Sequence, residues 1–422
     1  MRTRQRWGAG TWLALSITGQ MKASVIKRND DKGNTNMAAL NLTKKYIKAA
    51  QGLEPQIRAY QDEMENKRRM PLPLVQAMKD AGMFSLSMPK EWGGPEIDPI
   101  SQIKIVELLS AIDGSVGWAT MLGLHAGYFI PYLDQSVARN MYADLSAFTG
   151  GVTKPTGKAI IVNGGYRVSG RWTFGSCCQN STWLFSGCLV VEDGEPRIGV
   201  DGNPEILLCY LPGNAVEVIE TWTSTGLRGT GSHDYAITDH YVPAERAFNP
   251  IHTLSRRSEP LYSMRNMHLA NLAGIPLGIA RSSIDAVIEL TEHKSTRTGS
   301  QLREEAHVHT AVAQAEALLG SARGFVFDTM EDIWNALLHS KSISNRQYAL
   351  YRLSICKAYD NSVEAVDLMY KTGSGSSLYT SHPLDRYFRD IHAAAQHFVV
   401  SPKIIEAAGR VLIGLKPGVT TF

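Results

Sequence analysis

The spacing of apolar residues changes twice along this chain, and this double change limits the fold more than any other feature. From about residue 38 to 148 apolar residues recur with helical spacing, and from about 149 to 255 they form short strand-like runs. From about 256 to 408 long amphipathic helical segments return. The two periods bury different faces of the backbone, so each block needs its own core arrangement. The order predicts a helical domain, a β domain and a second helical domain.

Six short runs in the central block have the composition of strands. They are residues 158–162, 166–169, 183–191, 206–211, 216–219 and 235–242. Turn-forming pairs such as Asn163-Gly164 and Asp193-Gly194 separate several of them, and such pairs are typical of hairpins. Short strands joined by such turns form small barrels or sandwiches, and we expect a β-barrel.

Four long amphipathic segments follow the β block. They are residues 266–292, 306–338, 344–369 and 384–408. Four such helices predict an antiparallel four-helix bundle. The chain is then an α+β protein of mostly helical content, with domains at 38–148, 149–255 and 256–408. Residues 1–37 are expected to be a leader or a disordered segment, with Met37 as an alternative start, and residues 409–422 a tail.

Charge and cysteine content exclude several classes of function. A net charge of +3 over 422 residues is too small to indicate binding to nucleic acid or to an anionic membrane. Five cysteines without a CxxC pair fit neither a disulfide framework nor a zinc site, and they indicate a reducing, cytoplasmic location. No metal is expected, because His307-Val-His309 lacks a third ligand at a recognisable spacing. The apolar run 12–17 is too short to cross a bilayer.

The run RYFRDIHAAAQH, residues 386–397, carries the clearest functional signal. Its three alanines and the upstream Pro383 predict a helix. Arg389 and His397 are eight residues apart, a little over two turns, and would share one broad face. A cation and an imidazole in one pocket could hold an anionic cofactor and move a proton. The alternative is a surface helix with solvated histidines.

Three further stretches could contact a planar or charged ligand. The run Trp172-Thr173-Phe174 precedes Ser176 at a strand end. Its aromatic rings could stack on a planar ligand, and the Ser176 hydroxyl could form a hydrogen bond with the edge of that ligand. The alternative is that the tryptophan anchors the core of the sheet. Three glycines in residues 225–234 let the backbone approach a ligand, and Arg228 adds charge; a plain β-turn is the alternative. His125 is either a satisfied core histidine or a site residue.

Taken together, these segments resemble the acyl-CoA dehydrogenase superfamily over roughly residues 40–415. The resemblance is carried by VSGRWTF at 168–174, TGLRGTGSHD at 225–234, TRTG at 296–299 and the run from Gly373 to His397. Within the superfamily the sequence looks more like the flavin-dependent monooxygenases, such as p-hydroxyphenylacetate hydroxylase, secosteroid hydroxylase and dibenzothiophene monooxygenase. Many dehydrogenases end the matching helix in Tyr-Glu-Gly, whose glutamate is the catalytic base, whereas this chain has His397-Phe398-Val399.

The resemblance implies a helical domain, a β-barrel and a four-helix bundle, assembled as a homotetramer. It also implies a two-component reaction. A separate NAD(P)H-dependent flavin reductase supplies reduced flavin, FMNH2 or FADH2, which reacts with O2 to a C4a-hydroperoxyflavin. One oxygen atom then enters a small aromatic or polycyclic substrate in a dry pocket, without a nucleic acid or membrane partner.

Site roles follow from the same resemblance. His397 would stand beside the flavin, His125 on the substrate side, and Ser176 near flavin N5, with Ser169 and Thr173 as alternatives for that position. The remaining cofactor contacts are expected from Trp172, Thr173, Phe174, Arg228, Arg297 and Gly375. Of these, Arg297 and Gly375 would reach the flavin phosphate side from a neighbouring subunit.

Two other functions stay open at this point. An acyl-CoA dehydrogenase could use Glu292, Glu304 or Glu305 in the bundle as its base. A non-catalytic, tetrameric flavin-binding or scaffold protein would keep the same fold without needing His397.

Overall fold

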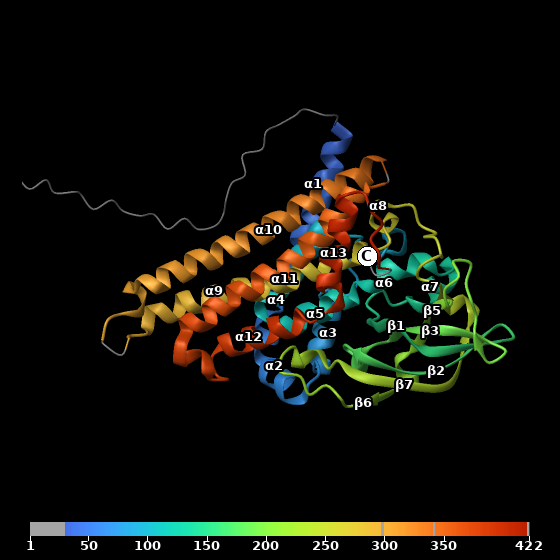
Figure 1. Ribbon diagram of the computed structural model, residues 1–422, viewed down its shortest axis with the longest axis horizontal. Helices are drawn as coiled ribbons and strands as arrows, with labels where there is room; N and C mark the ends of the chain where they lie inside the picture. Colours follow the sequence, from blue (N-terminus) through green and yellow to red (C-terminus); the bar gives the residue numbers. More distant parts are fainter. Residues whose placement is uncertain (1–29, 297–298, 341, 420–421) are drawn as a thin grey trace, which may run out of the picture. The chain divides into compact units, whose positions relative to one another are not determined.

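The N-terminal part of the chain is helical in the computed structural model, which describes residues 30–296, 299–340, 342–419 and 422 (Figure 1). Its helices are α1 (Asp30–Gly52), α2 (Glu54–Lys67), α3 (Leu72–Asp80), α4 (Pro99–Ile112), α5 (Gly114–Gly123), α6 (His125–Phe129) and α7 (Gln135–Met141). Helix α1 begins within residues 1–37, where the sequence predicted a leader or disorder. Among the described residues, no helix combines the length and apolarity needed to cross a bilayer.

Helix α5 occupies the interior, and all ten of its residues are buried. The Asp113 side chain caps it, accepting hydrogen bonds from the backbone N–H of Ser115 at 2.9 Å and of Val116 at 3.3 Å. These bonds satisfy two of the N–H groups that every helix N-terminus leaves without an intrahelical partner. Trp118 is thereby held on a fixed, buried helix.

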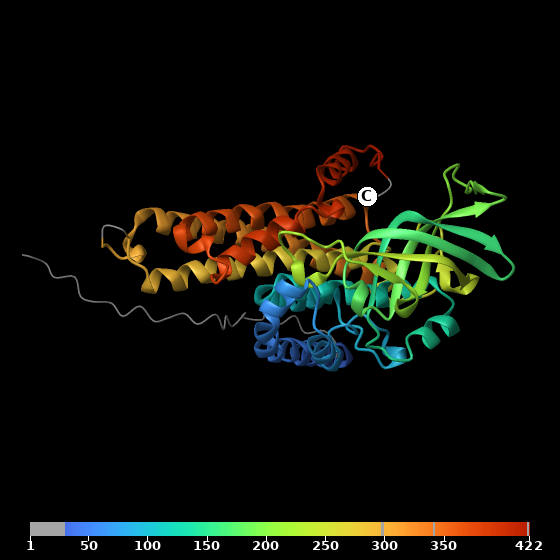
Figure 2. The same cartoon turned by 90° about the horizontal axis from the view of Figure 1, so that it is seen from below.

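The central segment forms one eight-stranded sheet (Figure 2). Its strands are β1 (Thr149–Val162), β2 (Gly165–Gly175), β3 (Trp183–Glu192), β4 (Glu195–Pro196), β5 (Ile206–Pro212), β6 (Glu217–Ile219), β7 (His233–Pro243) and β8 (Ala247–Phe248). The pairing order is β6-β7-β2-β1-β3-β5-β8, with β4 on β3. All pairs are antiparallel except β1 with β3. Where the sequence predicted a barrel, the strands form a sheet in which β6 is the first strand and β8 the last in the hydrogen-bonded order.

The C-terminal helices lie side by side in both views (Figures 1 and 2). After the short α8 (Pro260–Ser263) they are α9 (Gly274–His293), α10 (Ala306–Ser340), α11 (Asn345–Gly373), α12 (Pro383–Ala394) and α13 (Pro402–Leu412). The first three agree with the predicted segments, except that residues 267–273 form a 3-10 helix before α9. The fourth predicted helix, 384–408, is two helices.

The break between α12 and α13 corrects the expected placement of His397. Helix α12 ends at Ala394, and His397 lies in the connection before a 3-10 turn at Phe398–Val400. The residue before Pro402 is driven to extended backbone by the proline ring, so the helix cannot run through. The predicted shared helical face of Arg389 and His397 is therefore wrong.

Arg389 instead anchors α12 to neighbouring elements. Its guanidinium donates to the Thr225 carbonyl at 2.6 Å, to Glu65 at 3.2 Å and to Asp385 at 2.8 Å. A guanidinium that donates hydrogen bonds to three oxygens of different segments holds those segments together. The expected pocket cation is thus a structural cross-link.

Trp172 is a core residue of the sheet, which corrects its expected contact with a flavin ring. Its side chain has no exposed surface, and its Nε1–H donates to the Gly187 carbonyl at 2.8 Å. The indole stacks on Tyr235 with ring centroids 5.2 Å apart. An alternating strand sends successive side chains to opposite faces, so Trp172 points inward while its neighbours Arg171 and Thr173 are exposed. Phe174 is exposed as well because the strand is irregular between Trp172 and Gly175, where Phe174 has a positive φ.

Replacing Trp172 by Ala is therefore expected to destabilise the fold by about 3–5 kcal/mol, because it leaves a cavity and an unpaired carbonyl. Urea unfolding followed by circular dichroism measures the loss. Thr173→Ala, one residue along the same strand and exposed, is the matched control and should stay within about 0.5 kcal/mol of wild type. Equal stability of the two variants would show that Trp172 does not anchor the sheet.

Candidate functional site

Three hydroxyls and an indole form a continuous hydrogen-bonded chain at the end of β2. Trp118 Nε1 donates to Ser176 Oγ at 3.2 Å, and Ser176 Oγ lies 2.6 Å from Ser232 Oγ. Ser232 Oγ is in turn 2.7 Å from Thr230 Oγ1, which donates to the Leu227 carbonyl at 2.7 Å. These residues come from α5, the β2 end and the loop before β7. The chain of bonds therefore joins the helical region to the sheet.

Ser169 and Thr173, the alternatives to Ser176, do not take part in this arrangement. Ser169 is seven residues upstream, and its hydroxyl accepts the Asp239 backbone N–H at 2.8 Å. Thr173 is exposed on the sheet. Ser176 is therefore the hydroxyl that best fits a polar ligand edge at the end of β2.

Phe174 presents an aromatic surface next to this hydroxyl. Its side chain is 70% exposed, although its φ of 61° lies in the left-handed region that bulky residues rarely adopt. Trp222 approaches it edge-on with ring centroids 6.2 Å apart. Cys177, which follows Ser176, and Leu227, in the loop before β7, also have positive φ values. Backbone strain of this kind concentrates at ligand sites, where the surrounding structure enforces it.

The loop Thr225–Ser232 is clamped against α12. The Leu227 N–H donates to the Asp390 carboxyl at 2.6 Å. Gly226 approaches α12 so closely that a Cβ there would overlap the Arg389 carbonyl group. Only glycine permits this contact, which explains one of the glycines that the sequence suggested for ligand approach.

Asp390 is an unusual anchor, because its carboxyl group is buried. Burial raises the pKa of Asp390 to about 8, and the nearby Asp113 carboxyl adds to the rise, while the bond from Leu227 N–H opposes it. Burial also raises the pKa of Asp113, which Arg386 opposes. Two neighbouring buried carboxyl groups thus stand where the loop that carries Thr230 and Ser232 is bonded to α12.

The far end of the loop is also fixed. His233 Nδ1 accepts the Trp222 backbone N–H at 3.1 Å, and its Nε2 lies 3.3 Å from the Arg68 carbonyl. The ring therefore carries its hydrogen on Nε2. Gly231 has φ +51°, and a Cβ there would meet the same Arg68 carbonyl at 2.7 Å. The loop cannot shift at either end without losing these contacts.

Arg228 is used within the protein rather than left free for a ligand. Its Nε donates to the Glu65 carbonyl at 2.9 Å and its NH1 to the Ser224 carbonyl at 3.0 Å, with the Glu65 carboxylate 3.5 Å away. These contacts tie the loop to α2. Arg228 thus has a structural role, and its predicted contact with a cofactor stays a prediction.

His397 lies beside the hydroxyl chain. Its ring centroid is 5.5 Å from that of Trp118, in an edge-on arrangement. The Nδ1 atom is buried and has no hydrogen-bond partner among the described residues. Burial lowers the pKa of His397 to about 4, so the imidazole is neutral at neutral pH. An unpaired buried nitrogen of this kind is costly unless a ligand completes it.

His125 belongs to a second group of aromatic side chains, together with a histidine that the sequence did not single out. His268, on the 3-10 helix before α9, packs edge-on against His125 with centroids 4.9 Å apart. Phe129 and Phe185 lie 5.5 and 6.0 Å from the His125 ring. Both His125 nitrogens and His268 Nδ1 are buried, and within the part of the chain that the structure describes they have no hydrogen-bond partners.

Burial and neighbouring imidazoles keep this group uncharged. The pKa of His125 is lowered well below its ordinary value by burial, then by the nearness of His268 and His397. Burial also lowers the pKa of His268 to about 4. Among the described residues, this group holds neutral proton carriers in aromatic surroundings, which suits an aromatic ligand with one polar group.

The remaining expected residues lie elsewhere. Gly375 is exposed in a 3-10 turn after α11, and Lys294 Nζ bonds the Gly373 carbonyl and Ser376 Oγ beside it. Arg297 lies outside the described residues. Glu304 and Glu305 lie at the α9–α10 connection, which is at the end of the helices away from the sheet in both views (Figures 1 and 2).

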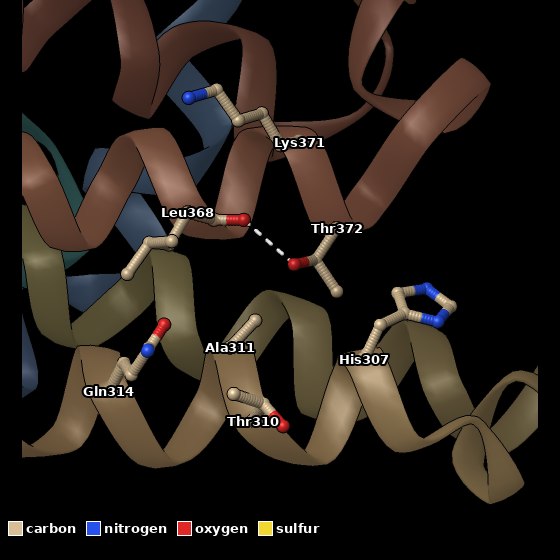
Figure 3. Close-up of a pocket in the computed structure, with 7 residues that line it drawn as sticks. All are labelled: His307, Thr310, Ala311, Gln314, Leu368, Lys371 and Thr372. Carbon is tan, nitrogen blue, oxygen red and sulfur yellow. Dashed lines mark hydrogen bonds between the residues drawn. The ribbon is translucent and has the colours of Figure 1, made fainter.

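A separate cavity lies between α10 and α11 and contains His307 (Figure 3). Thr310, Gln314 and Lys371 also line it. His309 is turned to the Arg303 carbonyl at 2.7 Å, so the two histidines of His307-Val-His309 do not converge. In the part of the chain that the structure describes, no three His, Cys, Asp or Glu side chains form a metal-binding group.

The site fits an isoalloxazine ring on three observations. The exposed Phe174 ring offers an apolar surface, and the buried Ser176 hydroxyl offers a polar contact two residues further on. His397 supplies an unpartnered nitrogen on the neighbouring side of Trp118. A flavin combines an apolar ring with polar edge atoms, which this set of groups would complete.

Comparison with known proteins agrees with this interpretation. The profile of the family described as acyl-CoA dehydrogenase, N-terminal domain, matches residues 48–136. The profile described as acyl-CoA dehydrogenase, C-terminal domain, matches residues 270–402. Together the two profiles cover more than half of the chain, one before and one after the strands of the sheet in the sequence.

Individual relatives are similar along nearly the full length. The chain is 28% identical over 392 residues to the flavin-dependent monooxygenase oxygenase subunit HsaA of Mycobacterium tuberculosis, covering 89% of this chain and 96% of that protein. It is 27% identical to an indole-3-acetate monooxygenase of Acinetobacter baumannii, covering 85% and 92%. The crystal structure of the M. tuberculosis HsaA monooxygenase superposes with a TM-score of 0.81 at 26% identity, covering 90% of this chain and 100% of that chain.

Because His268 and His397 are neutral in the folded protein, we expect the free energy of unfolding to fall in acid. Their folded-state pKa values lie below the unfolded value of about 6.5, so the unfolded chain binds more protons between about pH 4 and 6.5. Their contribution is complete above about pH 6.5 and is lost as pH falls through the folded pKa values.

The double variant His268→Gln/His397→Gln should therefore lose less unfolding free energy than wild type between about pH 7 and pH 4.5, measured by urea denaturation. Exposed His293→Gln is the control and should follow wild type. Parallel pH profiles for wild type and the double variant would refute the neutral state of these rings.

Proposed function

This chain belongs to the acyl-CoA dehydrogenase superfamily, in its flavin-dependent monooxygenase branch, and we propose that it inserts one oxygen atom from O2 into an aromatic substrate. The observation that carries the proposal is the neutral His397 imidazole against Trp118, whose indole N–H donates to Ser176; among the described residues, His397 Nδ1 has no hydrogen-bond partner. Reduced flavin, when bound, supplies the electrons that activate O2. The protein's own residues bind and orient that flavin, exclude water and hold protons.

His397 acts as a neutral hydrogen-bonding group. Because burial lowers its pKa to about 4, its ring has one N–H donor and one acceptor nitrogen at neutral pH. Such a ring can hold a proton near the activated oxygen without placing a positive charge there. A carboxylate at this place would be the mark of a dehydrogenase, but the next residue is Phe398, with a ring that cannot accept a proton.

Ser176, Thr173 and Phe174 form the flavin side of the site in this proposal. Ser176 is the contact for the N5 edge, and Phe174 with Trp222 covers the apolar end of the ring. Gly375 reaches the phosphate side of a flavin held by a neighbouring subunit, in a homotetramer; Arg297, predicted for the same contact, lies outside the described residues. FMN and FAD share the ring that these residues contact.

His125 and His268 form the substrate side. Their rings, with Phe129 and Phe185, offer an apolar wall and unpartnered nitrogens. A phenol or other hydroxylated aromatic matches this wall, and His125 can take its hydroxyl proton. The relative from A. baumannii is named for indole-3-acetate, which is also aromatic.

The partners follow from the two-component reaction. A cytoplasmic NAD(P)H:flavin reductase delivers the reduced flavin, and O2 and the aromatic substrate complete the set. Buried aromatic and imidazole groups around the site exclude water, which limits the loss of activated oxygen as hydrogen peroxide.

The test supplies reduced FMN or FAD, ¹⁸O2 and a panel of phenolic substrates to the purified protein. One ¹⁸O atom should appear in the product by mass spectrometry. In His397→Ala and in Ser176→Ala, the fraction of reduced flavin that yields product should fall by about 10²-fold, with hydrogen peroxide rising in its place. His240→Gln, on β7 away from the hydroxyl chain, is the control.

The competing functions give different results in the same protein. An acyl-CoA dehydrogenase would bleach bound oxidised FAD anaerobically on addition of an acyl-CoA, with no need for O2. A scaffold protein would show the same product and peroxide yields in His397→Ala as in wild type. Either outcome, without ¹⁸O in any product, would remove the proposal.

A further inference from the structure

The hydroxyl chain from Trp118 to Leu227 has a fixed direction. Each hydroxyl carries one hydrogen. Thr230 Oγ1 lies 2.7 Å from the Leu227 carbonyl, and this distance requires a hydrogen between the two oxygens, which only Thr230 can supply. The Thr230 hydroxyl must therefore accept from Ser232, since its own hydrogen is used.

The same reasoning passes along the chain to Ser176. The Ser232 hydrogen points to Thr230, so the 2.6 Å contact between Ser176 and Ser232 is a donation from Ser176. The Trp118 indole N–H, which can only donate, occupies one lone pair of Ser176 Oγ at 3.2 Å. Ser176 is left with one free lone pair and no free hydrogen, so toward a ligand it can accept but not donate.

Burial makes this arrangement persistent. Thr230 is 1% exposed and Ser232 5% exposed, so water does not compete for their hydrogens. The Cys177 N–H bonds the Thr230 carbonyl at 2.8 Å, which holds the two loops in register. The Leu227 carbonyl at the end of the chain also accepts the Trp222 indole N–H, so the terminal acceptor is fixed in place.

We infer that Ser232 and Thr230 are positioning residues that make the site select reduced over oxidised flavin. The inference rests on the proposed function, in which Ser176 meets N5. Reduced flavin carries a hydrogen on N5 and can donate it to the free lone pair of Ser176. Oxidised flavin has only a lone pair on N5, which would face another lone pair. The site thus binds the reductase product and releases the spent, oxidised ring.

The experiment measures dissociation constants of reduced and oxidised FMN, the reduced form under anaerobic conditions, by quenching of tryptophan fluorescence. Wild type should bind reduced FMN more than about tenfold tighter. In Ser232→Ala the Ser176 hydrogen is released and can turn to oxidised N5, so the ratio should fall about tenfold, chiefly through tighter binding of oxidised FMN. Thr230→Val, which breaks the chain one step further on, should act in the same direction.

Ser181→Ala is the matched control, because its hydroxyl bonds the Cys177 carbonyl in the same loop but lies outside the chain. It should keep the wild-type ratio. An unchanged ratio in Ser232→Ala and Thr230→Val, or equal weakening of both FMN forms, would overturn the inference. If wild type bound neither form of FMN or FAD, the proposed function itself would fail, which is a separate outcome.

Discussion

The hydrogen bond from the Leu227 N–H to the buried Asp390 carboxyl is the contact on which the site depends. It joins the loop before β7 to α12, and Gly226 makes the close approach possible. The same loop carries Thr230 and Ser232, which complete the contacts of Ser176. A shift of α12 would therefore move both the hydroxyl chain and the connection that holds His397. One buried carboxyl sets the relative positions of the sheet end and the C-terminal helices.

Electrostatics at the site favour neutral groups. Burial keeps His125, His268 and His397 uncharged at neutral pH, while the charged residues nearby are paired with each other, as Arg389 is with Asp385 and Glu65. An oxygen-transfer site benefits from proton carriers that bring no water shell with them. The proposed chemistry thus depends on desolvation as much as on any single side chain.

The sequence predicted the order of the helical and strand segments and the strand positions well, because apolar spacing reports which face of an element is buried. It placed His397 on a helix wrongly, since the alanines outweighed the signal from Pro402. It could not separate Trp172, which turns into the sheet core, from its exposed neighbours Thr173 and Phe174. Trp118 and His268 gave no signal, because each stands in an apolar run whose contacts only the fold reveals.

The most direct test of the proposed site is a crystal structure of the protein with reduced FMN bound under anaerobic conditions. We predict that the N5 edge of the flavin lies within hydrogen-bond distance of Ser176 Oγ, with the Phe174 ring against its apolar end and the His397 imidazole facing the reactive side. A flavin bound instead in the cavity between α10 and α11, or a carboxylate rather than His397 at the reactive side of the ring, would contradict this assignment.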